Sequence, residues 1–184
     1  GNAVTNRASV NRALKTTTAT TTYPDSVIAA ESTTSNGLLI RVVSKTGLTN
    51  SIGYDGIERQ VTQTDPRTGT STNHYATNGR LDWTRDAATN YTWFAYHPDT
   101  GRQIAVTNAA GDAVYAEYGD RGEELATWGA TYPIAYDWDD YGRKSAMYTL
   151  RPTNITLASY EDFLSNISSF DKTTWLYDTA TGLL

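Results

Sequence analysis

Hydrophobic and aromatic segments of about six residues alternate along this chain with polar bends centred on glycine, and the pattern repeats about every 20 residues. Gly-Arg pairs stand at Gly79-Arg80, Gly101-Arg102 and Gly142-Arg143, and the same slot is filled elsewhere by Gly37, Glu58-Arg59, Gly122-Glu123 and Gly182. The intervals between slots are 21, 21, 22, 21, 20 and 40 residues. We interpret the last interval as two periods with a degenerate copy near residue 162 between them. A fixed period of this length indicates an array of structural repeats.

Two further landmarks keep register with the glycine slot. An aromatic residue stands four or five positions before it, at Tyr54, Tyr75, Tyr96, Tyr118, Trp138 and Tyr177. A second bend rich in Asp, Asn, Pro and Gly follows it by seven to eleven positions, as in Asp65-Pro66-Arg67-Thr68-Gly69. Two turns per period leave two segments of strand length. The sequence therefore predicts an all-β fold, an antiparallel meander of hairpin repeats of about 20–22 residues that forms an open curved sheet.

Two regions depart from the pattern. Ser159–Ile167 offers a capping box, Ser159 with Asp162, followed by apolar residues at helical spacing, which predicts a short helix or compact loop near 159–168 within an insertion at about 152–171. Residues 1–15 show no clear pattern, and we expect a poorly ordered or degenerate segment there. The repeat array is assigned to residues 16–184. Alternation in strands such as 91–96 and 113–118 is mixed, so the buried face is left open.

Composition narrows the function. The 13 Tyr and 5 Trp supply much of the apolar surface, and the formal net charge is −5. The segment from Asp112 to Asp140 contains eight acidic residues and a single basic one, Arg121. A protein without a basic stripe does not attract phosphate backbones, so we expect no nucleic-acid partner. There is no cysteine and no apolar run long enough to span a membrane, and the polar start of the chain suggests a fragment of a larger protein.

Candidate chemistry is sparse. His74 and His97 fit polar surface positions, and no nucleophile elbow, phosphate loop or zinc spacing is present. The run Asp137-Trp138-Asp139-Asp140-Tyr141-Gly142 opens like a calcium loop, but its twelfth position is Tyr148 where a bidentate Glu is needed. A solvated acidic face explains it better, with a weak calcium site as the alternative. We therefore expect no catalytic residue, cofactor or metal.

The repeat resembles that of the Rhs/YD-repeat family, in which a Tyr-Asp pair precedes a Gly-Arg pair and a strand ending in an Asp-containing turn. Tyr54-Asp55 through Gly69, Tyr141-Gly142-Arg143, and Trp175 through Leu183 carry the resemblance, which covers residues 37 to 184. The family includes bacterial Rhs polymorphic toxins, the shell components of insecticidal toxin complexes, and animal teneurins. The resemblance implies a β-sheet wall of a hollow shell. Departures are Glu58 for glycine, Glu123 for arginine and Trp138 for tyrosine.

We therefore expect a non-catalytic scaffold, shell or stalk segment of a large exported bacterial protein, secreted or at the cell surface. Its partners would be neighbouring repeats of the parent chain and, through exposed sheet edges, other copies of itself. The alternative is a carbohydrate- or cell-wall-binding module that uses exposed aromatic rings, and an enzyme is a third hypothesis. The residues singled out are the aromatic positions Tyr54, Tyr75, Trp93, Tyr96, Tyr118, Trp138 and Tyr177 and the turn positions Gly79, Arg80, Gly101, Arg102, Gly122, Gly142 and Arg143.

Overall fold

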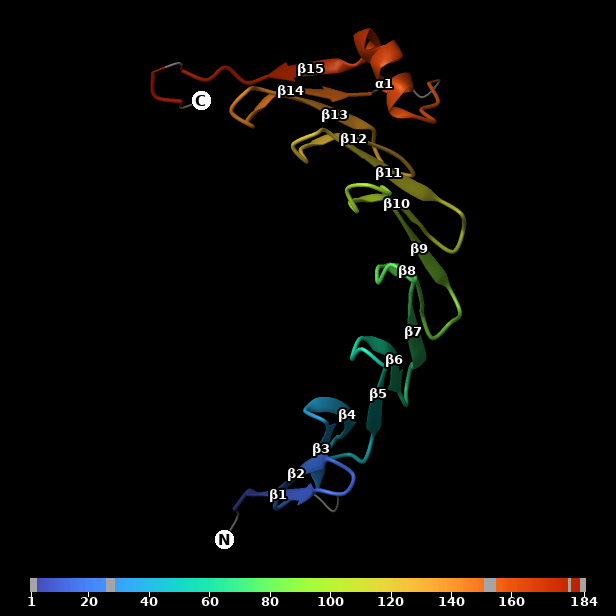
Figure 1. Cartoon of the computed structure of the whole chain (residues 1–184), viewed down its shortest axis with the longest axis vertical. Helices are drawn as coiled ribbons and strands as arrows, with labels where there is room; N and C mark the ends of the chain where they lie inside the picture. Colours follow the sequence, from blue (N-terminus) through green and yellow to red (C-terminus); the bar gives the residue numbers. More distant parts are fainter. Residues whose placement is uncertain (1–2, 26–28, 151–154, 179, 183–184) are drawn as a thin grey trace. The chain divides into compact units, whose positions relative to one another are not determined.

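A computed structural model describes residues 3–25, 29–150, 155–178 and 180–182, and divides the chain into two compact units, 1–91 and 92–184 (Figure 1). The first unit contains β1 (Thr5–Asn11), β2 (Thr16–Thr22), β3 (Ala30–Ser35), β4 (Leu38–Val43), β5 (Thr49–Tyr54), β6 (Gln60–Asp65), β7 (Gly69–Tyr75) and β8 (Leu81–Arg85). The strand β9 (Tyr91–Tyr96) begins at the last residue of the first unit. The second unit contains the rest of β9 and β10 (Gln103–Thr107), β11 (Ala113–Tyr118), β12 (Glu124–Gly129), β13 (Ile134–Trp138), β14 (Lys144–Thr149), α1 (Tyr160–Asn166), a 3-10 turn (Ile167–Ser169) and β15 (Asp171–Thr174).

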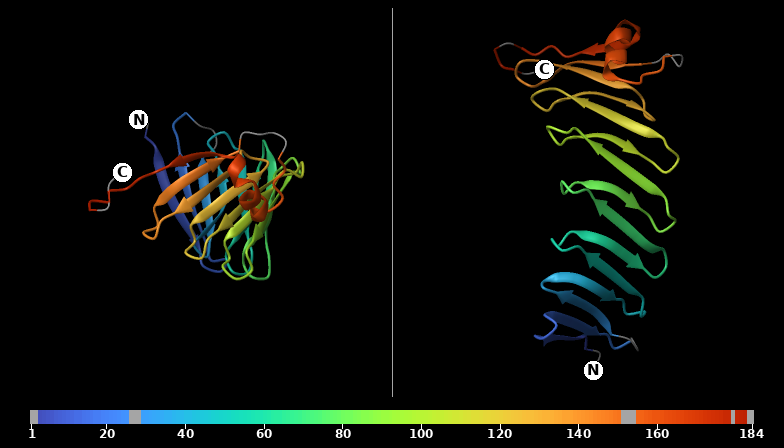
Figure 2. Two further views of the ribbon diagram at one scale, coloured as in Figure 1. Left: turned by 90° about the horizontal axis from the view of Figure 1, so that it is seen from above. Right: turned by 45° about the vertical axis from the view of Figure 1, so that its right-hand side comes forward.

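Strands that follow one another in the sequence are also neighbours in the sheet, and every described pair is antiparallel. Within each unit the strands twist and the sheet stays open rather than closing on itself (Figure 2). The predicted all-β fold, an open antiparallel meander with one short helical insertion, is confirmed.

The hairpin loops explain why the meander forms. We call the loops around the glycine slot the slot turns. In most of them the amide of the first residue donates to the carbonyl four residues on, as from Ala76 to Arg80 (2.8 Å) and from Asp139 to Arg143 (2.9 Å), and in the Gly101 turn to the carbonyl five residues on, from His97 to Arg102 (2.8 Å). The residue before that carbonyl has positive φ, 85° at Gly79 and 76° at Gly142, a conformation that glycine adopts without steric cost. The loops at the other strand ends, the far turns, close in the same way, as from Asn108 to Asp112 (2.9 Å).

A bulge accompanies the slot turns. Tyr54 pairs with Gln60 but Gly53 pairs with Thr62, so Val61 is an extra residue on its strand. The same shift occurs between the preceding residue and Tyr75, Tyr96, Tyr118 or Trp138. Bulges of this kind increase local twist and re-aim the adjacent side chain. The bulge therefore places these five aromatic residues in one recurring local geometry.

The interval of 40 residues between Gly142 and Gly182 is not two periods. β14 pairs directly with β15, from Thr149 with Asp171 to Ala146 with Thr174, so the interval is one period whose far turn is replaced by a long insertion. The interpretation of a degenerate copy near residue 162 was wrong, because spacing alone cannot separate a lost repeat from an enlarged turn. Within the insertion, residues 151–154 lie outside the described residues.

The capping box predicted for the insertion is present. Ser159 Oγ accepts from the Asp162 amide (3.3 Å), and the Asp162 carboxylate accepts from the Ser159 amide (2.9 Å). The pKa of Asp162 is lowered, chiefly by the Ala158 and Ser159 amides. These contacts fix the start of α1, which ends at Asn166.

The main buried cluster lies in the second unit. Phe163 of α1 is fully buried, at 0% exposure, and packs edge-on to Trp128 of β12 with ring centroids 6.1 Å apart. Small residues beneath it, Ala126, Ala135 and Ala146, are also buried and let the helix approach the sheet. In the first unit, by contrast, β1 is exposed along its whole length. Its pairing with β2 rests on backbone hydrogen bonds, which need no hydrophobic alternation, and this explains why a strand formed in residues 5–11 without a pattern in the sequence.

Candidate functional site

The recurring motif residues meet at the slot turns, where an aspartate positions an arginine. Asp55 Oδ1 accepts from the amides of Ile57 (3.1 Å) and Arg59 (3.0 Å), and its Oδ2 accepts from Arg59 Nε (2.8 Å). The Arg59 amide, and further the Arg59 side chain and the Ile57 amide, hold the pKa of Asp55 below its ordinary value of 3.8, against some desolvation. Asp139 and Arg143 repeat these contacts, with 2.7 Å between Arg143 Nε and Asp139 Oδ2. The motif aspartate therefore both closes the turn and aims the guanidinium.

The aimed guanidinium reaches the next repeat. Arg59 lies over the ring of Tyr75, 4.2 Å from its centroid, and donates to the carbonyl of Gly79 (3.1 Å). Arg143 lies 4.1 Å from the centroid of Tyr177 and donates to the carbonyl of Gly182 (3.2 Å). We call this arrangement the arginine–aromatic ladder; its described rungs are Arg59–Tyr75, Arg102–Tyr118 and Arg143–Tyr177.

Four aromatic residues of the repeat also bind backward, through their polar tips. The Tyr75 hydroxyl donates to the carbonyl of Gln60 (3.3 Å), at the bulge of the preceding hairpin. Tyr54 does the same to Leu39 (2.9 Å), Tyr177 to Lys144 (2.9 Å), and the indole N–H of Trp138 to Glu124 (2.9 Å). Tryptophan can stand in the tyrosine position because both side chains end in a donor.

The repeat of Gly122 lacks the slot arginine and binds its neighbour differently. Glu123 occupies the arginine position, and its carboxylate lies against Gly119 of its own turn. Arg121, two residues earlier, donates instead to the carbonyls of Asp140 (3.0 Å) and Asp139 (3.1 Å) in the next slot turn. The link between these two repeats is thus kept by an arginine from a shifted position.

The remaining predicted residues are distributed over the same turns and both sheet faces. Gly79, Gly101, Gly122 and Gly142 all have positive φ, and Arg80 and Tyr96 are both engaged in interactions. Trp93 is 46% exposed and three residues from Tyr96, so the two rings lie on opposite faces of β9. The residues predicted from the sequence therefore belong to the recurring contacts of the slot turns, except Trp93, which is exposed on the other face of β9.

The turn contacts also identify the aspartate of the Gly142 repeat. The Tyr-Asp equivalent in the repeat of Gly142 is Trp138-Asp139, because Asp139 makes the turn contacts, whereas Asp137 accepts from the Tyr148 hydroxyl (2.6 Å) on another strand. Arg59 and Arg121 were missing from the predicted residues. Arg59 followed a glutamate rather than a glycine, and nothing in the sequence marks Arg121 as a substitute.

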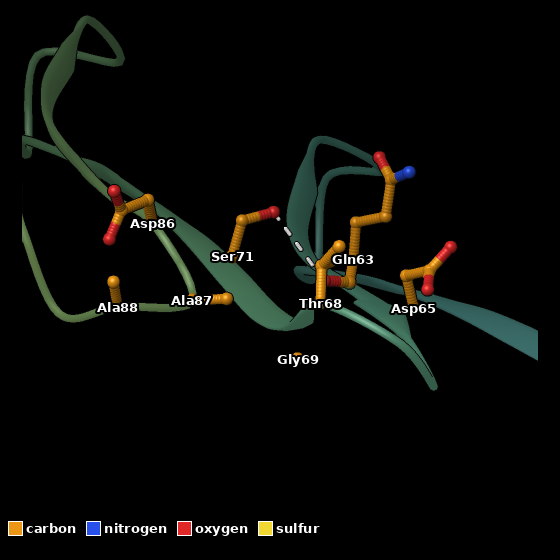
Figure 3. Close-up of a pocket in the computed structure, with 8 residues that line it drawn as sticks. All are labelled: Gln63, Asp65, Thr68, Gly69, Ser71, Asp86, Ala87 and Ala88. Carbon is orange, nitrogen blue, oxygen red and sulfur yellow. Dashed lines mark hydrogen bonds between the residues drawn. The ribbon is translucent and has the colours of Figure 1, made fainter.

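Among the described residues, the aspartates of the far turns act within their own turns. A hollow of about 440 Å³ lies between two far turns of the first unit and is lined by Asp65 and Asp86 (Figure 3). Asp65 Oδ1 accepts from the Arg67 amide (2.7 Å) and Asp86 Oδ1 from the Asn90 amide (2.8 Å), so each carboxylate closes its own turn. Over the described part of the chain, no three metal-binding side chains gather, and no helix is long and apolar enough to cross a membrane.

No family model and no curated protein matches this sequence. Solved structures match its fold. A crystal structure of TcdB2-TccC3 with Cdc42 aligns with a TM-score of 0.58 and 13% identity over 96% of this chain, and a crystal structure of TcdB2-TccC3 with 0.57 and 12% over 92%. A Photorhabdus luminescens Tc holotoxin pore aligns with 0.56 and 14% over 96%. This chain spans about 11% of the length of each of these chains, and the likeness is one of fold.

Proposed function

We propose that this chain is a non-catalytic structural segment, a length of sheet wall in a larger exported bacterial protein of the Rhs/YD-repeat kind. The observation that carries the proposal is the use of the motif side chains. The guanidinium of Arg59 or Arg143 contacts the following repeat, and the hydroxyl of Tyr75 or Tyr177 contacts the preceding one. The recurring side chains thus hold neighbouring repeats together, which is a structural role.

The fold likeness supports the same proposal. The structures that share the fold include toxin-complex chains about nine times as long as this one, in line with a segment of a larger wall. A secreted or surface location follows from this kind of parent protein. The strand edges offer a second partner: all of β1 is exposed, and an exposed edge can pair with another copy.

The proposal is tested by removing rungs. Arg59→Ala, Arg102→Ala and Arg143→Ala, singly and together, should lower the unfolding temperature progressively and increase proteolysis at the slot turns. Arg67→Ala is the matched control, since Arg67 lies in a far turn with its side chain 70% exposed. A triple variant as stable as the wild-type chain would contradict the structural role.

A carbohydrate-binding module is the second candidate, and the exposure of Trp93 favours it. Tyr115, 40% exposed, has its side chain on the same face of the second unit, as the strand pairing places it. A glycan array with the wild-type chain, Trp93→Ala and Tyr115→Ala would distinguish the two. Saturable binding lost in these variants, with ladder variants unaffected, would replace the structural proposal. Trp138→Phe serves as a further control, because the Trp138 indole is already bonded to Glu124.

A further inference from the structure

The rung between the repeats of Gly37 and Glu58 has no arginine. In the repeat of Gly37 the position after the glycine is Leu38, which occupies the place that Arg59, Arg102 and Arg143 have in three other repeats. The aromatic residue that would receive its guanidinium is Tyr54. The Tyr54 hydroxyl makes the usual bond to the preceding hairpin, at Leu39 (2.9 Å), but its ring face carries no cation from any described residue.

A groove lies at this position. It has a volume of about 420 Å³ and is lined by Leu38 and Ile40 on one side and by the Tyr54 turn on the other. The equivalent groove in the second unit has a volume of about 260 Å³ and holds Arg102. The residues that line the two grooves correspond at six positions. They are Arg102 and Leu38, Ile104 and Ile40, Glu117 and Gly53, Tyr118 and Tyr54, Gly119 and Asp55, and Asp120 and Gly56. The groove between Leu38 and Tyr54 is therefore equivalent to the groove that holds Arg102, but leucine stands in the position of the arginine.

The filled rungs show how such a groove holds a guanidinium. Arg102 lies over Tyr118 at 5.9 Å and donates to the carbonyl of Gly119 (3.5 Å), which also accepts from the Gly122 amide (2.9 Å). In the unfilled groove the corresponding carbonyl belongs to Asp55, which accepts from the Glu58 amide (3.1 Å) in the same way. A stacking surface and an acceptor are thus already in position.

The charge of the unfilled groove also favours a cation. Its lining includes no basic residue; the Asp55 carboxylate already pairs with Arg59 (2.8 Å), so the carboxylate of Glu58 is the charge that favours a cation here. Glu58 is exposed and replaces the slot glycine at φ 67°. A planar cation that can stack and donate to a carbonyl suits this surface better than an ammonium group, which is a hydrated point charge.

We propose that the groove between Leu38 and Tyr54 binds an arginine side chain presented by another polypeptide. The guanidinium lies over the Tyr54 ring and donates to the carbonyls of the slot turn, as the arginines of this chain do in the other repeats. This inference goes beyond the structural role and holds whether or not the chain is part of a wall.

Binding is measured by titrating the chain with N-acetyl-arginine methylamide and following amide chemical shifts in ¹⁵N-labelled protein. Saturable shifts are expected at Gly53, Asp55 and Gly56, with a dissociation constant of about 1 mM. N-acetyl-lysine methylamide should bind at least about threefold more weakly. Free arginine should bind more weakly than the blocked form, because its carboxylate is repelled by Glu58. Equal binding of the lysine compound would overturn the proposal.

Two sets of variants locate the site. Leu38→Arg should fill the groove from within, abolish the shifts, and raise the unfolding temperature by about 2 °C. Val10→Arg adds the same charge on an exposed strand and should leave binding unchanged. Should Leu38→Arg fail to fold, Tyr54→Phe, which keeps the ring, is expected to bind and Tyr54→Leu is not. Undiminished binding in Leu38→Arg or in Tyr54→Leu would refute the assignment.

Discussion

At the scale of the residue, the slot arginine combines three interactions whose separate strengths are modest. Arg59 pairs with Asp55 in its own turn, stacks on Tyr75, and donates to Gly79. The Arg59 side chain is 29% exposed, so water weakens each of these three interactions. Cation–π contacts at such sites contribute about 0.5–1 kcal/mol. The geometry of the planar fork, rather than the charge alone, determines the contact.

Replacing Arg59 should distinguish shape from charge. We expect Arg59→Ala to lower the free energy of unfolding by about 1–2 kcal/mol, and Arg59→Lys to lose about half as much, because lysine keeps the charge but not the planar fork. Urea unfolding at neutral pH measures both. A double-mutant cycle with Tyr75→Leu should give a coupling of about 0.5–1 kcal/mol, and additivity of the two changes would rule out the stacking contact.

The shifted arginine gives a second prediction at this scale. Arg121→Ala should lower stability by about 0.5 kcal/mol, since its side chain is 56% exposed. Adding Glu123→Arg to that variant should restore the loss by returning an arginine to the slot, where it can stack on Trp138. It also removes a buried carboxylate oxygen, Glu123 Oε2, that has no partner among the described residues. Thermal unfolding of the single and double variants, with Glu123→Gln as control, measures the rescue.

At the scale of the element, the turn rather than the strand specifies the repeat. The strands are short and mixed in pattern, whereas the slot turns combine a positive-φ residue, an aspartate or equivalent cap, and a bulge. Where the aspartate is absent another acceptor takes its place: Asn78 Oδ1 accepts from the Arg80 amide (3.1 Å), and His97 Nδ1 from the Thr100 amide (3.3 Å). This variation is why the repeat was found by spacing and not by one strict motif.

Acid should weaken the turns capped by aspartate. The Arg59 amide lowers the pKa of Asp55, and the Thr181 amide and hydroxyl lower that of Asp178. A pKa depressed in the folded state gives stability that is present above the unfolded value near 3.8 and is lost as pH falls through the folded value. The unfolding temperature should therefore fall between about pH 5 and pH 2. Asp55→Asn should be less stable at pH 7 and should show a flatter dependence; an unchanged slope would contradict the capping role.

The insertion helix makes a third kind of contact, through one side chain. Phe163→Ala should lower the free energy of unfolding of the second unit by about 3–5 kcal/mol, because the ring is fully buried against Trp128 and Phe170. Leu164→Ala, 52% exposed, is the matched control and should change it by less than about 1 kcal/mol. Circular dichroism and near-ultraviolet signals during urea unfolding report both. Equal losses in the two variants would mean that α1 does not pack as described.

At the scale of the whole molecule, apolar burial is unevenly distributed between the two units. The buried cluster of Trp128, Tyr148, Phe163 and their neighbours belongs to the second, whereas the strands of the first unit are rich in threonine and largely half-buried. A repeat array depends on contacts between neighbours, so local stability should follow this distribution.

Hydrogen exchange tests the expectation on two internal strands. Amides of β6 should exchange at least about tenfold faster than those of β13, although both strands are paired on either side. The difference comes from α1, which covers the sheet around Ala135. In Phe163→Ala the difference should shrink; slower exchange in β6 than in β13 in the wild-type chain would contradict it.

The sequence sufficed for the period, the fold class and the capped helix, because these depend on local turn chemistry and spacing. It did not suffice for the insertion, the shifted Arg121 or the order of contacts along the ladder. Whether Gly142 and Gly182 are one period apart or two depends on the pairing of β14 with β15, a contact between distant residues. The partner of Arg121 likewise lies 18 and 19 residues away, on a turn whose position only the folded sheet defines.

The insertion between β14 and β15 leaves the Arg143 rung intact: the guanidinium still lies on Tyr177, and the Tyr177 hydroxyl still reaches Lys144. The slot turns thus align neighbouring hairpins, whereas the far turns can vary in length. Such a division lets an ancestral array acquire new loops, helices or grafted modules at its far turns without losing the alignment of the hairpins that carry them.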